Sequence, residues 1–205
     1  MPSHFAADDA DIRALLENHG AADLITATAD GLLATFLPFI FDPAAHEQGA
    51  LLGHVARNND QWRRPAIGDA MVIVRGPDAY ISPSWYASKA EHGRVVPTWD
   101  YVLAHVHGEL VLHSEPDWLA AHVARLTSVH EGGRAEPWAV TDAPERFVAG
   151  QLRAIVGVEV RISRVEAKWK LSQNRPPADV DGVVAGLTAD GATAVAAAVQ
   201  AARRG

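Results

Sequence analysis

The chain has 205 residues, of which 48% are hydrophobic, and a formal net charge of −7. A chain of this size can bury a core without disulfides or metals, and the absence of cysteine excludes a disulfide scaffold, a thiol nucleophile and a cysteine-ligated metal. The acidic balance argues against a broad nucleic-acid-binding face. The N-terminal stretch lacks the pattern of a signal peptide, and the longest apolar run, 31–41, is about half a membrane span. We therefore expect a cytoplasmic protein that does not contact membranes.

The N-terminal half predicts a helix followed by strands. Residues 8–19 have helical periodicity and stop at Gly20. Two apolar runs, 23–28 and 32–39, flank Ala29-Asp30-Gly31, a signal for a tight hairpin. Further strands are predicted at 51–56, at 71–75 and 79–82 around a turn at 76–78, and at 98–113 with a break at Gly108.

The C-terminal half predicts one strand and three or four helices, since the segment after Pro176-Pro177 holds one or two. The first two helices are expected at about 115–130 and 143–153, with Ser114 as the cap of the first and a capping box of Asp142 and Glu145 at the second. Apolar residues alternate at 156–163 as in a half-buried strand, and Pro176-Pro177 precede helices near 178–187 and 192–203.

These elements do not alternate regularly between strand and helix. We therefore expect a mainly β or α+β fold, an antiparallel barrel with flanking helices, rather than a doubly wound sheet. Residues 1–187 are expected to form one domain. The Ala-rich helix at 188–205 either belongs to that domain or forms a tail.

The segment 80–101 is the strongest candidate for a ligand site. It holds all three tyrosines and two of the six tryptophans, interleaved with hydroxyls and cations. Flat apolar faces with polar groups beside them suit a planar, hydrogen-bonding, anionic ligand. The alternative is a surface loop held in place by amphipathic aromatics. The candidate contacts are Ser82, Ser84, Trp85, Tyr86, Lys89, Thr98 and Trp99.

A second candidate is the polar stretch that follows the strand at 51–56. Backbone N–H groups at the start of a helical turn, together with Arg57 and Asn59, could hold a phosphate. The alternative is an Asn-rich cap beside a surface arginine. The candidate contacts are His54, Arg57, Asn58, Asn59, Gln61 and Trp62.

A third candidate is the cationic stretch 161–175, which carries a local charge of about +4 within an acidic chain. Gln173 and Asn174 could recognise the edge of a heteroaromatic ring, and Lys170 and Arg175 an anion, with Ser172 between them. The alternative is an ordinary loop, or a strand edge protected by lysines.

Other chemistry finds little support in the sequence. His105, His107 and His113 share a strand face with metal-ligand spacing, but no carboxylate pattern accompanies them, so we expect buried or interfacial histidines and no metal. The chain has no nucleophile elbow, P-loop or dinucleotide-binding glycine motif, and no helix-turn-helix pattern. No catalytic residue is assigned.

Longer motifs in a fixed order resemble a known family. They are Asp30–Thr35 with Leu37-Pro38, Gly53–Asn58 with Gln61-Trp62, Tyr80–Tyr86 with Ser88–Gly93, Val96–Trp99 with Tyr101, and Lys168–Arg175. The chain resembles the PaiB family of FMN-binding negative transcriptional regulators, which have the FMN-binding split-barrel fold. Asp100 and Ala87 depart from the Asn and Pro that the resemblance leads us to expect at these positions.

The resemblance implies a homodimer that binds two FMN molecules at the subunit interface. The phosphate would lie near residues 54–59, and the segments 80–101 and 170–175 would surround the isoalloxazine ring. A flavin-sensing or indirectly acting repressor is then the first functional hypothesis. The alternatives are a flavin-dependent oxidoreductase that acts on a small acceptor or an amine, and a haem-binding split-barrel protein. The net charge and the lack of a DNA-reading helix weigh against direct DNA binding.

Overall fold

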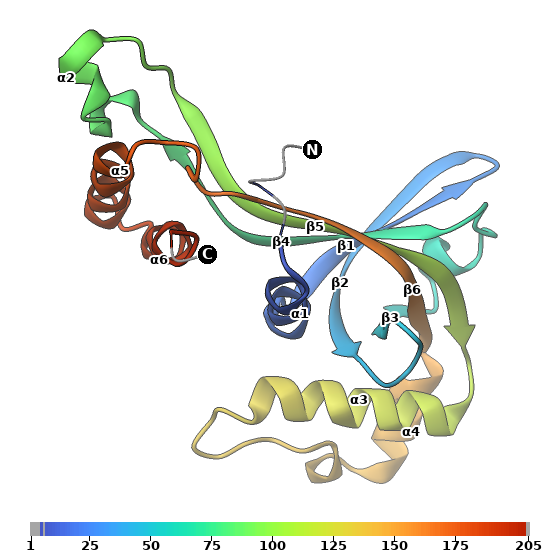
Figure 1. Ribbon diagram of the computed structural model, residues 1–205. Coiled ribbons are helices and arrows are strands. Elements are labelled where there is room, and N and C mark those ends of the chain that lie inside the picture. Colours follow the sequence, from blue (N-terminus) through green and yellow to red (C-terminus); the bar gives the residue numbers. More distant parts are fainter. Residues whose placement is uncertain (1–4, 6, 204–205) are drawn as a thin grey trace. The chain divides into compact units, whose positions relative to one another are not determined.

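The computed structural model describes Phe5 and residues 7–203, and Figure 1 gives the course of the chain. Two compact units share the strands. The barrel unit comprises residues 16–74 and 105–165, and the helical unit comprises the described parts of residues 1–15, 75–104 and 166–205. Each unit is described separately below.

Six strands form a closed barrel in the order β1-β2-β3-β6-β5-β4. Antiparallel pairing joins β1 to β2 and β4, and β3 to β2 and β6. The predicted antiparallel barrel with flanking helices is therefore confirmed. The strands are β1 (Ala21–Thr28), β2 (Gly31–Asp42), β3 (Ala50–Ala56), β4 (Ala70–Ile81), β5 (Thr98–His113) and β6 (Ile155–Lys170).

The helices flank these strands in both halves of the chain. Among the described residues, no helix is long and apolar enough to cross a membrane. The α-helices are α1 (Asp9–Asn18), α2 (Ser88–His92), α3 (Pro116–Glu131), α4 (Glu145–Arg153), α5 (Pro177–Ala189) and α6 (Thr193–Ala201), and the short 3-10 helices are η2 (Asp60–Trp62), η3 (Pro83–Trp85) and η4 (Val140–Asp142).

Local signals predicted the first hairpin correctly. β1 pairs with β2 from Thr28↔Gly31 to Ala21↔Pro38, so Ala29 and Asp30 form the turn. Gly31 has φ +113, a conformation that glycine adopts without steric cost. The predicted helices at 178–187 and 192–203 are likewise present as α5 and α6.

Two predicted breaks in the strands are wrong. β4 runs without a turn through Gly76 and Pro77, and β5 continues through Gly108. A Cβ on Gly76 would lie 2.7 Å from the Cβ of Val102, and one on Gly108 would collide with the carbonyl of Arg161. Both glycines are thus needed for the close approach of a neighbouring strand, not for a turn.

The predicted capping residues are also wrong, although the helices exist. The N-cap of α3 is Glu115 rather than Ser114, and it makes no side-chain capping bond. Asp142 lies in η4, where its carboxylate accepts the N–H of Ala139 at 2.9 Å, and α4 begins after Pro144. The pattern therefore marked the helix starts only to within a few residues.

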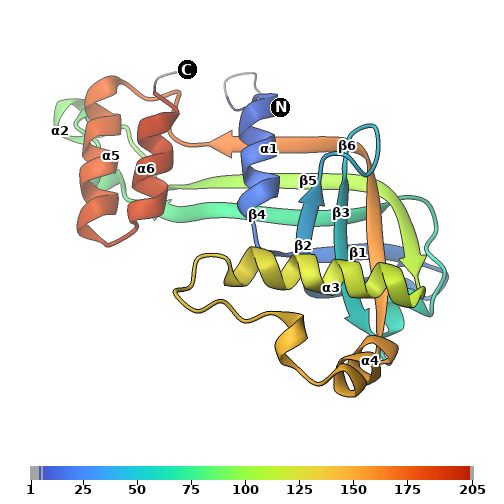
Figure 2. The ribbon, with the colours of Figure 1, turned by 90° about the horizontal axis from the view of Figure 1, so that it is seen from below.

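Helix α3 covers the outer face of the barrel across β3 and β6 (Figure 2). Val156, Val158 and Val160 of β6 are buried as predicted, but Gly157 and Glu159 on the opposite face are buried too. The ring of Trp118 occupies the space that a side chain at position 157 would fill. The predicted half-buried strand is therefore covered on both faces here.

A ladder of rings fastens α3 to the barrel. His113 stacks on Trp118 with ring centroids 4.1 Å apart, and Trp118 stacks on His122 at 5.2 Å. His122 Nε2 lies 3.1 Å from Nδ1 of His54 on β3, and His113 Nε2 lies 2.7 Å from a carboxylate oxygen of Glu159. His54 of β3 and His113 of β5 thus hold α3 against the barrel through His122 and Trp118.

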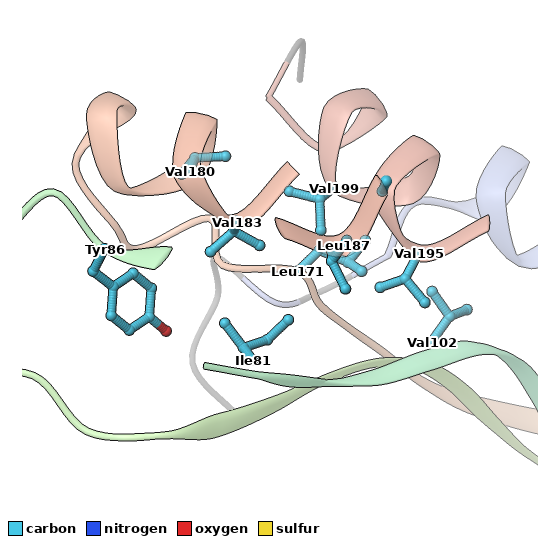
Figure 3. Close-up of a cluster of buried hydrophobic side chains, with 10 residues drawn as sticks. Ile81, Tyr86, Val102, Leu171, Val180, Val183, Leu187, Val195 and Val199 are labelled. Carbon is cyan, nitrogen blue, oxygen red and sulfur yellow. The ribbon is translucent and has the colours of Figure 1, made fainter. Parts of the chain in front are cut away.

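The helical unit has its own apolar core (Figure 3). Strand residues Ile81 and Val102 meet side chains from α5 and α6, and each buried aliphatic side chain contributes roughly 1.5–3 kcal/mol. The helix residues are Val180, Val183, Leu187, Val195, Ala196 and Val199. The Ala-rich segment therefore supplies part of a core rather than a surface alone.

The buried ring of His122 gives a prediction for stability against pH. Burial, with the charges of His54, Arg125 and His113, lowers the pKa of His122 from 6.5 to about 4. The unfolded chain therefore binds this proton more readily than the folded chain. The free energy of unfolding should be highest above about pH 6.5 and should decrease as the pH drops toward 4, by up to about 3 kcal/mol. Urea titrations across this range would measure the slope.

A matched pair of variants isolates this contribution. His122→Gln should flatten the slope but leave the part due to His54 and His19, whose pKa values burial also lowers. His130→Gln, at an exposed position of the same helix, should leave it unchanged. The slope is the readout, because His122→Gln can also change stability at all pH values. An equal slope in both variants would contradict the assignment.

Candidate functional site

The residues predicted to contact a ligand fall into both units. His54, Arg57, Asn58, Asn59, Gln61 and Trp62 belong to the barrel unit. The other twelve belong to the helical unit. Each group is built separately from its own contacts.

Arg57 ties the end of β3 to the start of β6. Its Nε donates to the carbonyl of Arg153 and its Nη2 to that of Ile155, both at 2.8 Å. The backbone N–H of Arg57 donates to the carbonyl of Ala154 at 2.7 Å. Part of the Arg57 guanidinium is therefore already hydrogen-bonded to the protein backbone.

Trp62 lies between two guanidinium groups. The Cζ atoms of Arg57 and Arg63 are 5.8 and 5.7 Å from its ring centroid. Trp62 Nε1 and Arg63 Nη2 both donate to the carbonyl of Arg57, at 3.1 and 3.0 Å. Sequence reasoning missed Arg63, although its position next to Trp62 was an available signal. Together with the exposed Asn58, these residues form a cationic aromatic surface, named here the β3–η2 set.

Two predicted contacts near this set face inward instead. Gln61 is 2% exposed, donates to Thr26 Oγ1 at 2.7 Å and accepts from Thr35 Oγ1 at 3.0 Å. Asn59 caps η2 by accepting the N–H of Gln61 at 2.7 Å. The hydrogen bonds of both side chains therefore stabilise the turn that contains η2. His54 lies in the ring ladder under α3, so its ring does not join the β3–η2 set.

The histidines predicted to share a strand face have separate partners. His113 belongs to the ladder, and His107 Nδ1 lies 3.3 Å from Arg164 Nη2. Within the described part of the chain, no three His, Asp or Glu side chains come together as metal ligands.

In the helical unit, the centre of the candidate site is the fully buried carboxylate of Asp100. It accepts from Ser172 Oγ at 2.7 Å and lies 3.3 Å from Lys170 Nζ. Lys170 also donates to Thr98 Oγ1 at 2.7 Å and to the carbonyl of Trp99 at 2.5 Å. Burial raises the pKa of Asp100, while Ser172 and Lys170 oppose the shift. The negative charge of Asp100 is thus enclosed and paired.

The loop after β6 satisfies its own polar groups. Gln173 accepts the N–H of Leu171 at 2.7 Å and donates to the carbonyl of Trp169 at 2.6 Å. Ser172 has φ 60, a left-handed conformation that its bond to Asp100 helps to hold. Asn174 is exposed, and the guanidinium of Arg175 lies 4.6 Å from the ring centroid of Tyr86. The loop presents Asn174 and Arg175 from a fixed backbone.

Two aromatic residues of the predicted ligand wall belong to the core. Side chains at Gly182 and Gly186 of α5 would collide with the carbonyl and the ring of Trp85. Tyr86 is buried in the apolar core, where burial raises the pKa of its hydroxyl. The ring of Tyr86 is therefore enclosed, and the ring of Trp85 is packed against α5 and only partly exposed.

Polar residues around η3 stabilise the same corner. Ser82 Oγ accepts the N–H of Ser84 at 3.2 Å, and Lys89 Nζ donates to Ser84 Oγ at 3.0 Å. Asp179 of α5 accepts from both the N–H and the hydroxyl of Ser88, each at 2.9 Å. These contacts fix α2 against α5.

The exposed aromatic surface consists of Tyr80 and Trp99. Each is 49% exposed, and their ring centroids lie 6.3 Å apart in an edge-to-face arrangement. Trp99 Nε1 donates to Asp78 Oδ1 at 2.8 Å. Tyr80 was not among the predicted contacts. We name Tyr80, Trp99, Lys170 and Asn174 the β5–β6 set.

Comparisons with known sequences agree with this domain type. Residues 1–164 match the family model described as "Putative FMN-binding domain". The matched range ends before the loop at 171–175, α5 and α6.

Solved structures with the same fold are distant in sequence. The FAD and haem binding protein from Mycobacterium smegmatis superposes with a TM-score of 0.58 at 15% identity, over 82% of this chain and 74% of the other. The flavocytochrome Anf3 from Azotobacter vinelandii gives 0.55 at 14% identity, over 80% and 68%. These similarities show the split-barrel fold.

One curated relative extends the sequence match beyond residue 164. The protease synthase and sporulation protein PAI 2 of Bacillus subtilis is 30% identical over 186 residues, which covers 90% of this chain and 86% of the relative. With the family-model match, this places the chain: it belongs to the PaiB family of FMN-binding-domain proteins.

Proposed function

We propose that the protein binds FMN as a homodimer and acts as a flavin-sensing regulator. The observation that carries the proposal is the match of residues 1–164 to the FMN-binding domain family. Each of the two residue sets is assigned to one part of the ligand.

The β3–η2 set is proposed to bind the FMN phosphate. Its donors are guanidinium and amide groups, which suit a dianion through charge-assisted hydrogen bonds. Because Arg57 is already bound to two carbonyl groups, Arg63 and Asn58 are the side chains expected to contribute most.

The β5–β6 set is proposed to bind the isoalloxazine ring. Trp99 and Tyr80 offer exposed flat faces, and Asn174 offers an amide for the ring edge. Lys170 holds the start of β5 in place through Thr98, Trp99 and Asp100. A bound flavin would provide one- or two-electron redox chemistry, and these residues would bind and orient it.

A second copy of the chain is proposed to complete the site. Leu32 and Phe36 of β2 are 75% and 70% exposed, and both lie on the outer face of the strand. Exposed large apolar side chains on one face of a sheet are typical of a protein–protein contact. Light scattering that gave the 21.9 kDa mass of a single chain would contradict the dimer.

The regulatory part of the proposal rests on the PaiB relative, and we propose that it acts indirectly. The net charge of −7 disfavours direct contact with DNA. In a retention assay with promoter DNA, binding should vanish at modest salt. Sequence-specific retention at physiological salt would show a direct regulator instead.

Absorption spectroscopy of the purified protein tests the cofactor. We expect flavin bands, release of FMN on denaturation, and rebinding at micromolar concentration. Trp99→Ala should weaken FMN binding about tenfold, since stacking contributes about 1–3 kcal/mol. Trp138→Ala is the matched control, because Trp138 is 47% exposed and lies outside both sets. A Soret band in place of flavin bands would favour the haem-binding alternative.

A comparison of FMN with riboflavin tests the phosphate assignment. Arg63→Gln should weaken FMN binding about tenfold and leave riboflavin binding unchanged, because riboflavin lacks the phosphate. Arg134→Gln removes an exposed arginine outside both sets and should change neither affinity. Equal losses for FMN and riboflavin in Arg63→Gln would place Arg63 elsewhere in the site.

A further inference from the structure

A pocket of about 230 Å³ lies in the helical unit between the 171–177 loop, α5 and the end of α6. Its lining residues are Leu171, Ser172, Gln173, Arg175, Pro177, Val180, Val199, Ala202 and Arg203. All of them follow residue 164, where the match to the family model ends.

The floor of the pocket is apolar and its volume is small. Leu171, Val180 and Val199 are buried core residues (Figure 3). Pockets for drug-sized ligands have about 300–1,000 Å³, so this one suits a more compact molecule than a flavin.

The charged residues that line the pocket are both arginines. Arg203 pairs with Asp181 at 2.7 Å, but that carboxylate is largely exposed, so the pair contributes little. Arg175 lies over the ring of Tyr86, and its charge also acts to lower the pKa of the buried Asp100. An anion in the pocket would meet two cations.

The loop is already organised for such a ligand. Ser172 is bound to Asp100, and both ends of the Gln173 amide are bound within the loop. The backbone from which Arg175 extends is therefore fixed before any ligand arrives, which lowers the entropic cost of binding.

We propose that this pocket binds a compact organic monocarboxylate. Its apolar body would lie on Val180 and Val199, and its carboxylate would pair with Arg175 and Arg203. This ligand is distinct from the flavin, so the inference goes beyond the proposed function.

Calorimetry with the full chain as purified tests the pocket, with benzoate as the probe and benzamide as its neutral counterpart. Benzoate should bind once per chain, and benzamide about tenfold more weakly or not at all. Equal binding of the two probes, or no benzoate binding at millimolar concentration, would overturn the proposal.

Three variants locate the binding. Ala202→Leu fills the pocket and Arg203→Gln removes a cation, so each should weaken benzoate binding about tenfold or more. Arg134→Gln, in the barrel unit, should bind benzoate normally. Circular dichroism and flavin content should match the parent protein in all three.

Two outcomes separate this proposal from the flavin assignment. One-for-one displacement of benzoate by FMN would place benzoate in the flavin site and overturn the separate pocket. Normal benzoate binding by a protein that binds no FMN would support the pocket and contradict the proposed function.

Discussion

The helical unit depends on one buried charge. Asp100 has no exposed surface, and its carboxylate accepts from Ser172 and faces Lys170. Burying a carboxylate costs several kcal/mol unless it is paired and hydrogen-bonded. The start of β5, the end of β6 and the loop that follows must therefore meet around it. That requirement fixes the backbone from which Asn174 and Arg175 are presented, so a residue that departs from the family pattern organises this loop.

The parts of the fold that could be predicted from sequence are those set by neighbouring residues. The β1–β2 hairpin, β6 and the C-terminal helices follow from turn residues and periodicity within about ten residues. The predictions of breaks at residues 76–78 and at Gly108 were wrong, because Gly76 and Gly108 allow Val102 and Arg161 of neighbouring strands to approach closely. A glycine needed for a turn and one needed for a close approach look the same in a single sequence.

The candidate site shows the same division. Sequence composition selected the segments of the candidate site, but it could not decide which aromatic faces stay exposed. Trp85 is covered because Gly182 and Gly186 admit α5, whereas Trp99 stays half exposed. His54 fits the family motif, yet its ring is directed to His122 on α3. Which side chains reach a ligand is decided by packing partners far away in the chain.

The order of synthesis gives the core of the helical unit a further consequence. Ile81 and Tyr86 leave the ribosome early, but Val195, Ala196 and Val199, which pack with them, are made more than a hundred residues later. The β1–β2 hairpin can pair as soon as it emerges, since its contacts are local. Until α6 has been synthesised, the apolar side chains of the aromatic segment that pack against it stay uncovered. A nascent chain of this protein is therefore most exposed to misassembly and most dependent on chaperones between the synthesis of β4 and that of its last helix.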